Sequence, residues 1–190
     1  SVYDADADAD ANNRLISSYL FCMVLTTTIL SILLVVYIQT VHYRRKVITD
    51  DFLRNVSYPK TVEEAHELSV RCLYQDFPFL SEKALEFGLF KTFAIPSISR
   101  ILDSTGELGH RTNKRYDDTD ILIREFNEHL PTSKRSQAAI KRLNFIHDQY
   151  QISNRDYIYV LAIFIVEPIR WIEKFGYRNI SIKEKVAIYL

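Results

Sequence analysis

Glycine, cysteine and net charge are the features this sequence has least of. Its 190 residues include 4 Gly and 2 Cys, which excludes a collagen-like chain and a fold held together by several disulfides. A hydrophobic content of 47% excludes a disordered chain. The 24 Lys and Arg residues are balanced by 24 Asp and Glu residues. Since phosphate binding needs a clustered positive field, we expect no nucleic acid among the partners.

Familiar catalytic motifs are also absent. The sequence has no glycine-rich phosphate loop, no CxxC or HExxH zinc signature and no nucleophile elbow. Cys22 lies in an apolar run, and Cys72 lies in a helical pattern where a buried thiol is the usual interpretation. Candidate functional residues must therefore be sought among polar side chains that occupy apolar patterns.

The longest apolar run lies near the N-terminus. Residues 15–38 carry no charge, and a helix of 24 residues is long enough to cross a hydrocarbon core of roughly 30 Å. The run is longer than the core of a cleaved signal peptide and lacks a small-residue cleavage site. It therefore predicts a single transmembrane helix that acts as a signal anchor.

The charges that flank this run predict its orientation. Arg44, Arg45 and Lys46 follow it, whereas Arg14 precedes it after an acidic leader. The positive-inside rule then places the following domain in the cytosol. Two glycosylation sequons, at Asn55 and Asn179, favour the opposite, lumenal orientation.

We expect four segments along the chain. They are an acidic low-complexity leader over 1–14 that forms a solvated tail, the transmembrane helix over 15–38, a juxtamembrane helical segment over 39–76 and a helical domain over 77–190. The sequence starts at Ser1 rather than Met and stops within a helical pattern at Leu190. We therefore expect it to be a C-terminally incomplete piece of a longer protein.

Helical patterns dominate after the anchor, and no segment alternates with a strand period. Capping pairs predict three helix starts, at Thr61 with Glu64, at Ser153 with Asp156 and at Ser181 with Glu184. Further helices are expected from Ser81 to before Pro96 and over 117–130. A loop over 103–113 separates two helical groups, because it holds two glycines and lacks an apolar period.

Residues 157–166 form the most apolar run of this domain. Ten uncharged residues are too few to span a bilayer, so the run predicts a buried core helix that is kinked near Pro168. Glu167 and Arg170, three residues apart, are interpreted as an ion pair near the end of this helix.

His147 is the clearest polar residue in an apolar pattern. It shares one helical face with Ile140, Leu143 and Tyr150, so its imidazole should point into the domain. One interpretation is a core histidine that is hydrogen-bonded to a carbonyl. The other is a metal or haem ligand, since neutral imidazole is the commonest metal-binding side chain and an apolar wall suits a porphyrin. The remaining histidines have no ligand-like neighbour in the sequence: His42, His66, His110 and His129.

Arg115 and Thr119 form a second candidate pair, four residues apart on one side of a helix start. Arg115 could simply pair with Asp118 or Asp120, which contributes at most about 1 kcal/mol on a surface. Alternatively, the arginine and the hydroxyl face one pocket and orient bound dioxygen.

The segments 114–126 (KRYDDTDILIREF) and 139–178 resemble the catalytic domain shared by the fungal endoplasmic-reticulum-bound MpaB-type oxygenases and the bacterial rubber oxygenases, the latex clearing proteins. The resemblance extends from about residue 77 to the end. Its most specific elements are the RYxDT block, a helix that ends in a single histidine and the EPxRWI block. A membrane helix before this domain also resembles the fungal branch.

The resemblance implies an all-α oxygenase that uses dioxygen on carbon–carbon double bonds of isoprenoid chains. A globin-like helical packing would be one way to build it. In the bacterial branch the cofactor is haem b, whose proximal histidine matches His147, and an arginine and a threonine near the distal side match Arg115 and Thr119. One position departs from the bacterial pattern, because Asp118 stands where a lysine can act as a second haem ligand. The bacterial catalytic carboxylate has no match in the segment 97–109.

The main hypothesis is a single-pass protein of the endoplasmic reticulum membrane with a cytosolic oxygenase domain. His147 would hold haem iron, Arg115 and Thr119 would position dioxygen, and a hydrophobic isoprenoid-like substrate would enter from the lipid bilayer. Two alternatives remain open. One is a catalytically inactive or truncated membrane-tethered helical protein with a structural role, and the other is an oxygenase with non-haem iron.

Overall fold

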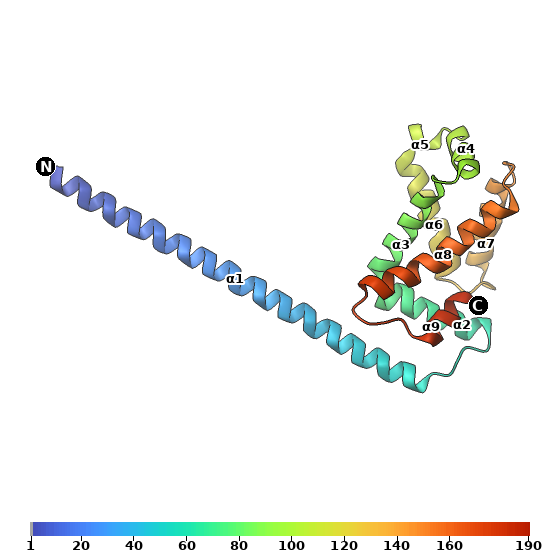
Figure 1. Cartoon of the computed structure of the whole chain (residues 1–190), viewed down its shortest axis with the longest axis horizontal. Coiled ribbons are helices and arrows are strands. Elements are labelled where there is room, and N and C mark those ends of the chain that lie inside the picture. The colour runs from blue at the N-terminus through green and yellow to red at the C-terminus, as the bar shows by residue number, and fades with distance from the viewer. Residues whose placement is uncertain (1) are drawn as a thin grey trace. The chain divides into compact units, whose positions relative to one another are not determined.

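The computed structural model describes residues 2–190, with side chains described for residues 16–107 and 109–190. These residues form helices and no strand, which confirms the all-α prediction (Figure 1). The elements in chain order are α1 (Val2–Asn55), α2 (Val62–Val70), the π-helical turn η1 (Arg71–Asp76), α3 (Pro78–Thr92), α4 (Pro96–Ser104), α5 (Glu107–His110), α6 (Thr112–Asn127), α7 (Lys134–His147), α8 (Asn154–Phe175) and α9 (Ile182–Tyr189).

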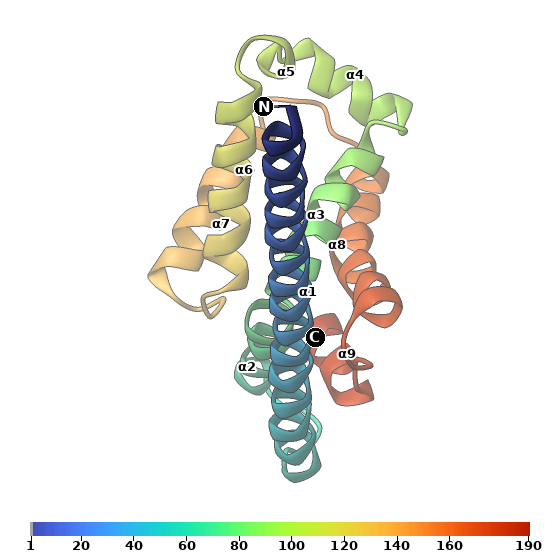
Figure 2. The same cartoon turned by 90° about the vertical axis from the view of Figure 1, so that its left-hand side faces the viewer.

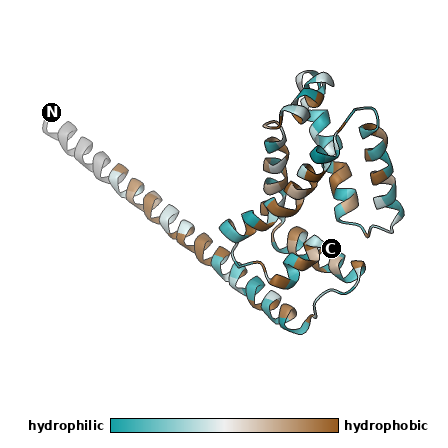
Figure 3. Cartoon of the chain, turned by 45° about the vertical axis from the view of Figure 1, so that its right-hand side comes forward, coloured by the Kyte–Doolittle hydropathy of each residue, from teal (hydrophilic) through white to brown (hydrophobic). Residues whose placement is uncertain are grey.

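The chain divides into two units, residues 1–50 and residues 51–190, and each is described by itself. The first unit consists of α1 without its last turn. This helix extends beyond the predicted span of 15–38 in both directions, and the backbone of the acidic leader is helical too. The leader's side chains lie outside the described residues. Figure 3 shows the apolar band along the middle of the helix.

Polar side chains in this apolar band form hydrogen bonds within their own helix. The hydroxyls of Thr26, Thr28 and Ser31 donate to backbone carbonyls three or four residues earlier, at 2.8–2.9 Å. In hydrocarbon an unsatisfied hydroxyl is costly, so this internal bonding suits a lipid environment. The helix is long and apolar enough to cross a membrane, as the sequence predicts.

Three helix pairs organise the second unit: α3 packs on α8, α6 on α7 and α2 on α9 (Figures 1 and 2). The larger buried cluster joins η1 to the C-terminal part of α8 and consists of Cys72, Phe77, Ile169, Ile172 and Ile180. The prediction of a buried Cys72 thiol is confirmed. A smaller cluster joins α2 and α9 and consists of Ala65, Leu68 and Ala187.

The three predicted capping residues cap the helices where the sequence places them. Ser153 and Ser181 accept hydrogen bonds from the backbone N–H groups three residues later, both at 3.2 Å. Ser181 and Glu184 form a complete capping box. Thr61 also caps α2, but the Glu64 carboxylate accepts from the backbone of Lys60 rather than from that of Thr61.

Of two expectations near the middle of the chain, one is confirmed and one is wrong. The helix before Pro96 ends at Thr92, as predicted, and it begins at Pro78 rather than at Ser81. Pro96 itself begins α4, because the first helical turn needs no N–H donor and tolerates proline. The expected loop over 103–113 contains the end of α4, all of α5 and the start of α6. Among the residues that the structure describes, Gly106 alone, with φ of 66°, has the left-handed backbone typical of a glycine turn.

The prediction of a buried helix over 157–166 is also wrong for most of its length. Tyr157, Ile158 and Leu161 are exposed, and Ile163 is buried. The reason is the position of the packing partner, because α3 meets α8 from Ile163 toward the C-terminus. A Cβ added to Gly88 would lie 2.4 Å from a methyl group of Ile163, so the two helices touch there. The helix continues through Pro168 without interruption.

The expected apolar face of α7 is confirmed in part, because Leu143, His147 and Tyr150 are partly buried. Ser136 and Ala139 are buried, whereas Ile140 is 39% exposed. The face that α7 turns toward α6 therefore includes small residues, which allow the two helices to approach closely.

A buried ion-pair network links η1 to the start of α9. The Arg178 guanidinium donates to both carboxylate oxygens of Glu184, at 2.6 and 3.0 Å, and to Asp76 at 2.6 Å. Burial acts to raise the pKa of Glu184, but hydrogen bonds from Arg178 and from the Ser181 backbone lower it below its usual 4.5. The network holds the C-terminal segment against the larger buried cluster.

We predict that Glu184→Gln destabilises the second unit by about 3 kcal/mol, because breaking a buried pair leaves the guanidinium undercompensated. Urea unfolding can be followed by the fluorescence of Trp171, the single tryptophan. Lys185→Gln, which breaks the more exposed pair with Glu173, is the matched control and should cost less than about 1 kcal/mol. Equal losses of unfolding free energy in Glu184→Gln and Lys185→Gln would contradict the structural role of the Arg178–Glu184 pair.

The depressed pKa of Glu184 also predicts a pH dependence. The stabilisation is fully present above the unfolded-state pKa near 4.5 and is lost as the pH falls below it toward the folded-state value. The unfolding free energy of Glu184→Gln should therefore fall less steeply with acid than that of the unaltered chain. Parallel pH profiles would show that Glu184 titrates equally in both states.

The close packing of α3 on α8 leads to a third prediction. Gly88→Ala should destabilise the unit by about 1–3 kcal/mol, since the new methyl group would overlap Ile163. Gly109→Ala is the control, because nothing lies within 4 Å of the added Cβ. In thermal melts, Gly88→Ala should have a clearly lower melting temperature than Gly109→Ala. Equal melting temperatures would contradict the close contact between α3 and α8.

Candidate functional site

The second unit contains two neighbouring pockets. The first has a volume of about 860 Å³ and lies between α3 and α6, with residues of η1 and α4 also in its wall. The second has a volume of about 370 Å³ and lies between α4, α6, α7 and α8. Both volumes fall in the range of small-molecule sites. The pockets share four wall residues, Leu89, Thr92, Leu102 and Arg115.

His147 lies in the wall of the second pocket, at the end of α7. Its ring is 5.7 Å from that of Tyr157, and it makes no hydrogen bond to any described residue. The interpretation as a carbonyl-bonded core histidine therefore has no contact to support it. Burial, and next the positive charge of Arg115, lower the pKa of His147 below its usual 6.5, against a smaller opposing effect of Asp148. The imidazole is thus neutral near pH 7, which is the form that binds metals.

Arg115 lies at the boundary between the two pockets. It lines the walls of both pockets. Its positive charge lowers the pKa of His147, which lies in the wall of the second pocket. The expected pairing of Arg115 with Asp118 or Asp120 is not found among the described side chains. These carboxylates pair instead with Lys114 and Arg124 on the same helix.

Thr119 lies one turn after Arg115 on α6, as the spacing predicts, but it faces the first pocket and not the second. Its hydroxyl donates to the Arg115 carbonyl at 2.8 Å. The structure therefore brings Arg115 together with His147 and places Thr119 on the other side of the boundary. Asp118, at the position where the bacterial pattern has a lysine, lies in the second pocket and is paired with Lys114.

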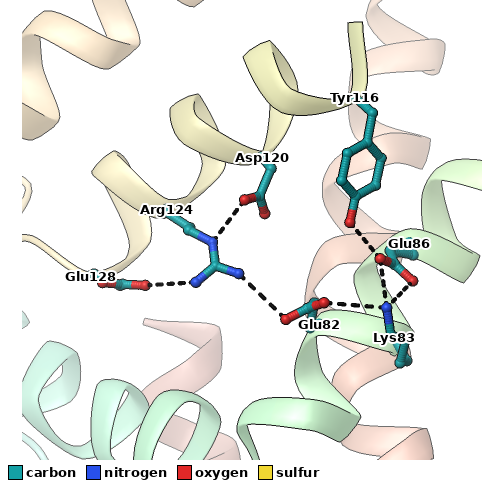
Figure 4. A network of polar contacts seen from close by, with 7 residues as sticks. All are labelled: Glu82, Lys83, Glu86, Tyr116, Asp120, Arg124 and Glu128. Carbon is teal, nitrogen blue, oxygen red and sulfur yellow. Dashed lines mark hydrogen bonds and ion pairs between the residues drawn. The ribbon is translucent and has the colours of Figure 1, made fainter. Parts of the chain in front are cut away.

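A polar network that the sequence analysis missed bridges α3 and α6 (Figure 4). The Tyr116 hydroxyl donates to Glu86 at 2.5 Å, and Lys83 donates to both oxygens of Glu86 at 2.8 Å. On the other side, Arg124 lies 3.4 Å from Glu82.

The same network contains pairs within one helix. Arg124 lies 2.9 Å from Asp120 and 3.8 Å from Glu128, one turn away in each direction. The spacing of these three residues was visible in the sequence. The pairing of α3 with α6 was not, because it joins residues that are 30 and 42 positions apart.

The two pockets differ in charge. The first is lined by the four carboxylates of Glu82, Glu86, Asp120 and Glu128 and by the two guanidinium groups of Arg115 and Arg124. The second has more cations than carboxylates in its wall. Its cations are Arg111, Lys114, Arg115 and Arg142, and its carboxylates are Glu107, Asp118 and Asp156.

The second pocket offers one imidazole and no metal cluster. Within the described part of the chain no group of three or more His, Cys, Asp or Glu side chains is placed to hold a metal ion. A cofactor that brings its own ligands and needs one protein donor, such as haem, fits this donor set better than a bare metal ion does.

Glu167 lines neither pocket and instead links α8 to α3. Its buried carboxylate is 2.7 Å from Lys91 of α3 and 3.5 Å from Arg170. The predicted pair with Arg170 is present, and the shorter contact is the one across to α3.

We predict that Arg115→Gln raises the pKa of His147 in the metal-free chain, because a positive charge that disfavours the imidazolium is removed. The pKa should stay below 6.5, since the burial remains. An NMR titration of the His147 ring protons measures both effects. Arg142→Gln, which also alters the second pocket, is the control and should leave the titration unchanged.

Three curated fungal proteins are similar to this chain. They are the ER-bound oxygenase mpaB of Penicillium roqueforti (strain FM164) and the ER-bound oxygenases mpaB and mpaB' of Penicillium brevicompactum. Each is 40% identical over 134 residues, which is 67% of this chain. The matched part covers 45%, 34% and 32% of these relatives, respectively, so the chain spans less than half of their length.

No protein-family model matches the chain, and no solved structure matches it. The sequence relationship therefore carries the assignment, and it agrees with the resemblance seen in the RYxDT and EPxRWI blocks. Over the matched residues, this chain belongs to the family of the ER-bound oxygenase mpaB proteins.

Proposed function

We propose that this chain is part of a membrane-anchored, dioxygen-dependent oxygenase that uses haem b and acts on a hydrophobic isoprenoid-like substrate. The observation that carries the proposal is the neutral, partly buried imidazole of His147 in a pocket that it shares with Arg115. The names of the curated relatives support an oxygenase.

The haem would be held by residues of the second pocket. His147 would hold the iron, and apolar side chains of α4, α7 and α8 would contact the porphyrin faces. The exposed cations of this pocket, Arg111, Lys114 and Arg142, would pair with the two propionates. The apolar wall residues are Leu89, Ile98, Ile101, Leu102, Ile146, Ile152 and Val160.

When bound, the iron supplies the dioxygen-binding and redox chemistry that no protein side chain can supply. The guanidinium of Arg115 is placed to donate hydrogen bonds to oxygen atoms at the boundary between the pockets. The Thr119 hydroxyl donates its proton to the Arg115 carbonyl, so its oxygen would act only as an acceptor toward a ligand. The same hydrogen bond would stabilise the α6 backbone at Arg115.

The first pocket would take the substrate. Its larger volume and its wall of apolar residues from α3, α4 and α6 suit an extended hydrocarbon chain. A membrane span on the same polypeptide would raise the local concentration of such a lipid-soluble molecule at the domain. We place the protein in the endoplasmic reticulum membrane with the second unit in the cytosol, as the flanking charges favour.

Haem binding is testable through His147. The full chain, purified in detergent after expression with haem supplementation, should give a b-type pyridine haemochrome spectrum that His147→Ala abolishes. His66→Ala, a histidine on α2 outside both pockets, should leave the spectrum unchanged. A colourless, iron-free protein would reject haem and would favour the inactive, membrane-tethered alternative.

The cytosolic orientation makes a separate prediction. Asn55 and Asn179 are both exposed, so both sequons would be accessible to glycosylation in the lumen. Chains translated into microsomes should show no mass shift on endoglycosidase treatment. A shift that is absent from an Asn55→Gln/Asn179→Gln variant would reverse the orientation.

A further inference from the structure

We propose that the second unit has a membrane-docking face of its own, which lies on the surface of an anionic lipid bilayer. This face is the aromatic stripe, which consists of Phe87, Phe90 and Phe93 of α3 and Trp171 and Phe175 of α8. The contact is additional to the membrane span of α1. It depends on neither the cofactor nor the reaction proposed above.

The rings of the aromatic stripe form a continuous row across two helices. On α3, the centroid of Phe90 lies 6.3 Å from that of Phe93 and 6.5 Å from that of Phe87. Phe87 then meets Trp171 of α8 at 5.7 Å, and Trp171 meets Phe175 at 5.6 Å. The members are three residues apart on α3 and four apart on α8, so on each helix they share one face.

The aromatic stripe is exposed rather than buried. Phe90 is 68% exposed and Phe175 is 57% exposed, while Phe87 and Phe93 are 42% and 43% exposed. Trp171 is partly buried. Single exposed apolar residues are normal on a protein surface, but a contiguous apolar patch with polar residues at its edge marks a contact with a partner or a membrane.

The lysines beside the aromatic stripe favour lipid over a protein partner. The Lys91 ammonium lies 4.8 Å from the centroid of the Phe87 ring, and that of Lys174 lies 5.1 Å from the centroid of the Phe175 ring. Lysine is depleted in protein–protein interfaces. At a membrane surface, by contrast, aromatic rings lie at the headgroup level and lysine side chains extend their charge toward the headgroups.

The charges on this part of α8 also complement anionic headgroups. The side chain of Arg170, next to Trp171 in the sequence, is 66% exposed. Its partner Glu167 is buried, and the exposed Glu173 is paired with Lys185. Clusters of Lys and Arg near a bilayer are attracted to anionic lipids. The edge of the stripe therefore suits a bilayer that contains such lipids.

The membrane span on the same polypeptide keeps the aromatic stripe within reach of lipid. Residues 39–50 separate the predicted span from the second unit, which corresponds to about 18 Å of helix. A connection this short gives the unit a high effective concentration of lipid surface, so a weak peripheral contact suffices. Because Phe90 and Phe93 also line the first pocket, docking would place part of that pocket's wall at the lipid surface.

Trp171 can report docking directly, because it is the single tryptophan and belongs to the aromatic stripe. The full chain is reconstituted into vesicles of phosphatidylcholine and phosphatidylserine, with or without bromine atoms on the acyl chains. Bromine quenches tryptophan fluorescence only at short range. We expect brominated vesicles to lower the Trp171 emission about twofold, since a docked ring lies at the headgroup level. The docked ring should also be protected from quenching by aqueous acrylamide.

Two exposed phenylalanines provide a variant and its matched control. Phe175→Glu should remove most of the bromine quenching, because it places a charge where the stripe would enter the lipid interface. Phe145→Glu should leave the quenching unchanged. Phe145 of α7 is 60% exposed and has the Arg142 guanidinium 5.5 Å from its ring, but it lies outside the stripe. The ratio of emission in brominated and unbrominated vesicles cancels any direct effect of residue 175 on Trp171.

Lys174→Glu tests the electrostatic part of the contact without removing a ring. This variant should be quenched less than the unaltered chain in vesicles that contain phosphatidylserine, because a repulsive charge replaces an attractive one. In pure phosphatidylcholine the difference should shrink. An equal effect in both kinds of vesicle would contradict the role assigned to anionic lipid.

Three outcomes would overturn the proposal. Unchanged emission in brominated vesicles, with free access of acrylamide, would mean that the aromatic stripe faces water. A Trp171 ring shielded from both quenchers would assign the stripe to a protein surface, either a second copy or further polypeptide. Equal quenching in Phe175→Glu and the unaltered chain would place the lipid contact elsewhere. None of these measurements requires haem or substrate, so their failure leaves the proposed function standing.

Discussion

The packing of α3 on α8 is the contact on which the rest of the second unit depends. It combines a close backbone approach at Gly88, where the neighbouring methyl group of Ile163 leaves no room for a Cβ, with the pair between Lys91 and the buried Glu167. Because this contact holds one face of α3, the opposite face is presented to α6. Both pockets take part of their wall from α3.

The polar network between α3 and α6 then follows from that placement. Lys83 joins two glutamates on its own helix, Tyr116 reaches across to Glu86, and Arg124 reaches across to Glu82. Contacts of this kind between partly exposed groups contribute little stability one by one. Their larger effect is electrostatic, since they leave the first pocket lined with more negative than positive groups while the second has the reverse. Two adjacent apolar spaces thereby acquire different chemistry.

The candidate site shows how far local sequence patterns reach. His147 was identifiable because a histidine on an apolar helical face needs an explanation, and the structure places it in a pocket wall without a hydrogen-bond partner among the described residues. Arg115 and Thr119 lie on one side of α6, as their spacing predicts, yet Arg115 lines both pockets whereas Thr119 lines the first pocket and not the second. Helical periodicity specifies the side of a helix, whereas the neighbouring helices decide which space that side faces.

The sequence by itself determined the helical class, the apolar membrane helix, the capped helix starts at Thr61, Ser153 and Ser181, and the family relationship. These features depend on residues that are close together in the chain, and local hydrogen bonding and hydrophobic periodicity express them directly. The tertiary structure alone decided the exposure of Tyr157 and Leu161, the α3–α6 network and the contrasting charges of the two pockets. Such properties arise from contacts between distant segments, whose geometry depends on how the whole unit packs.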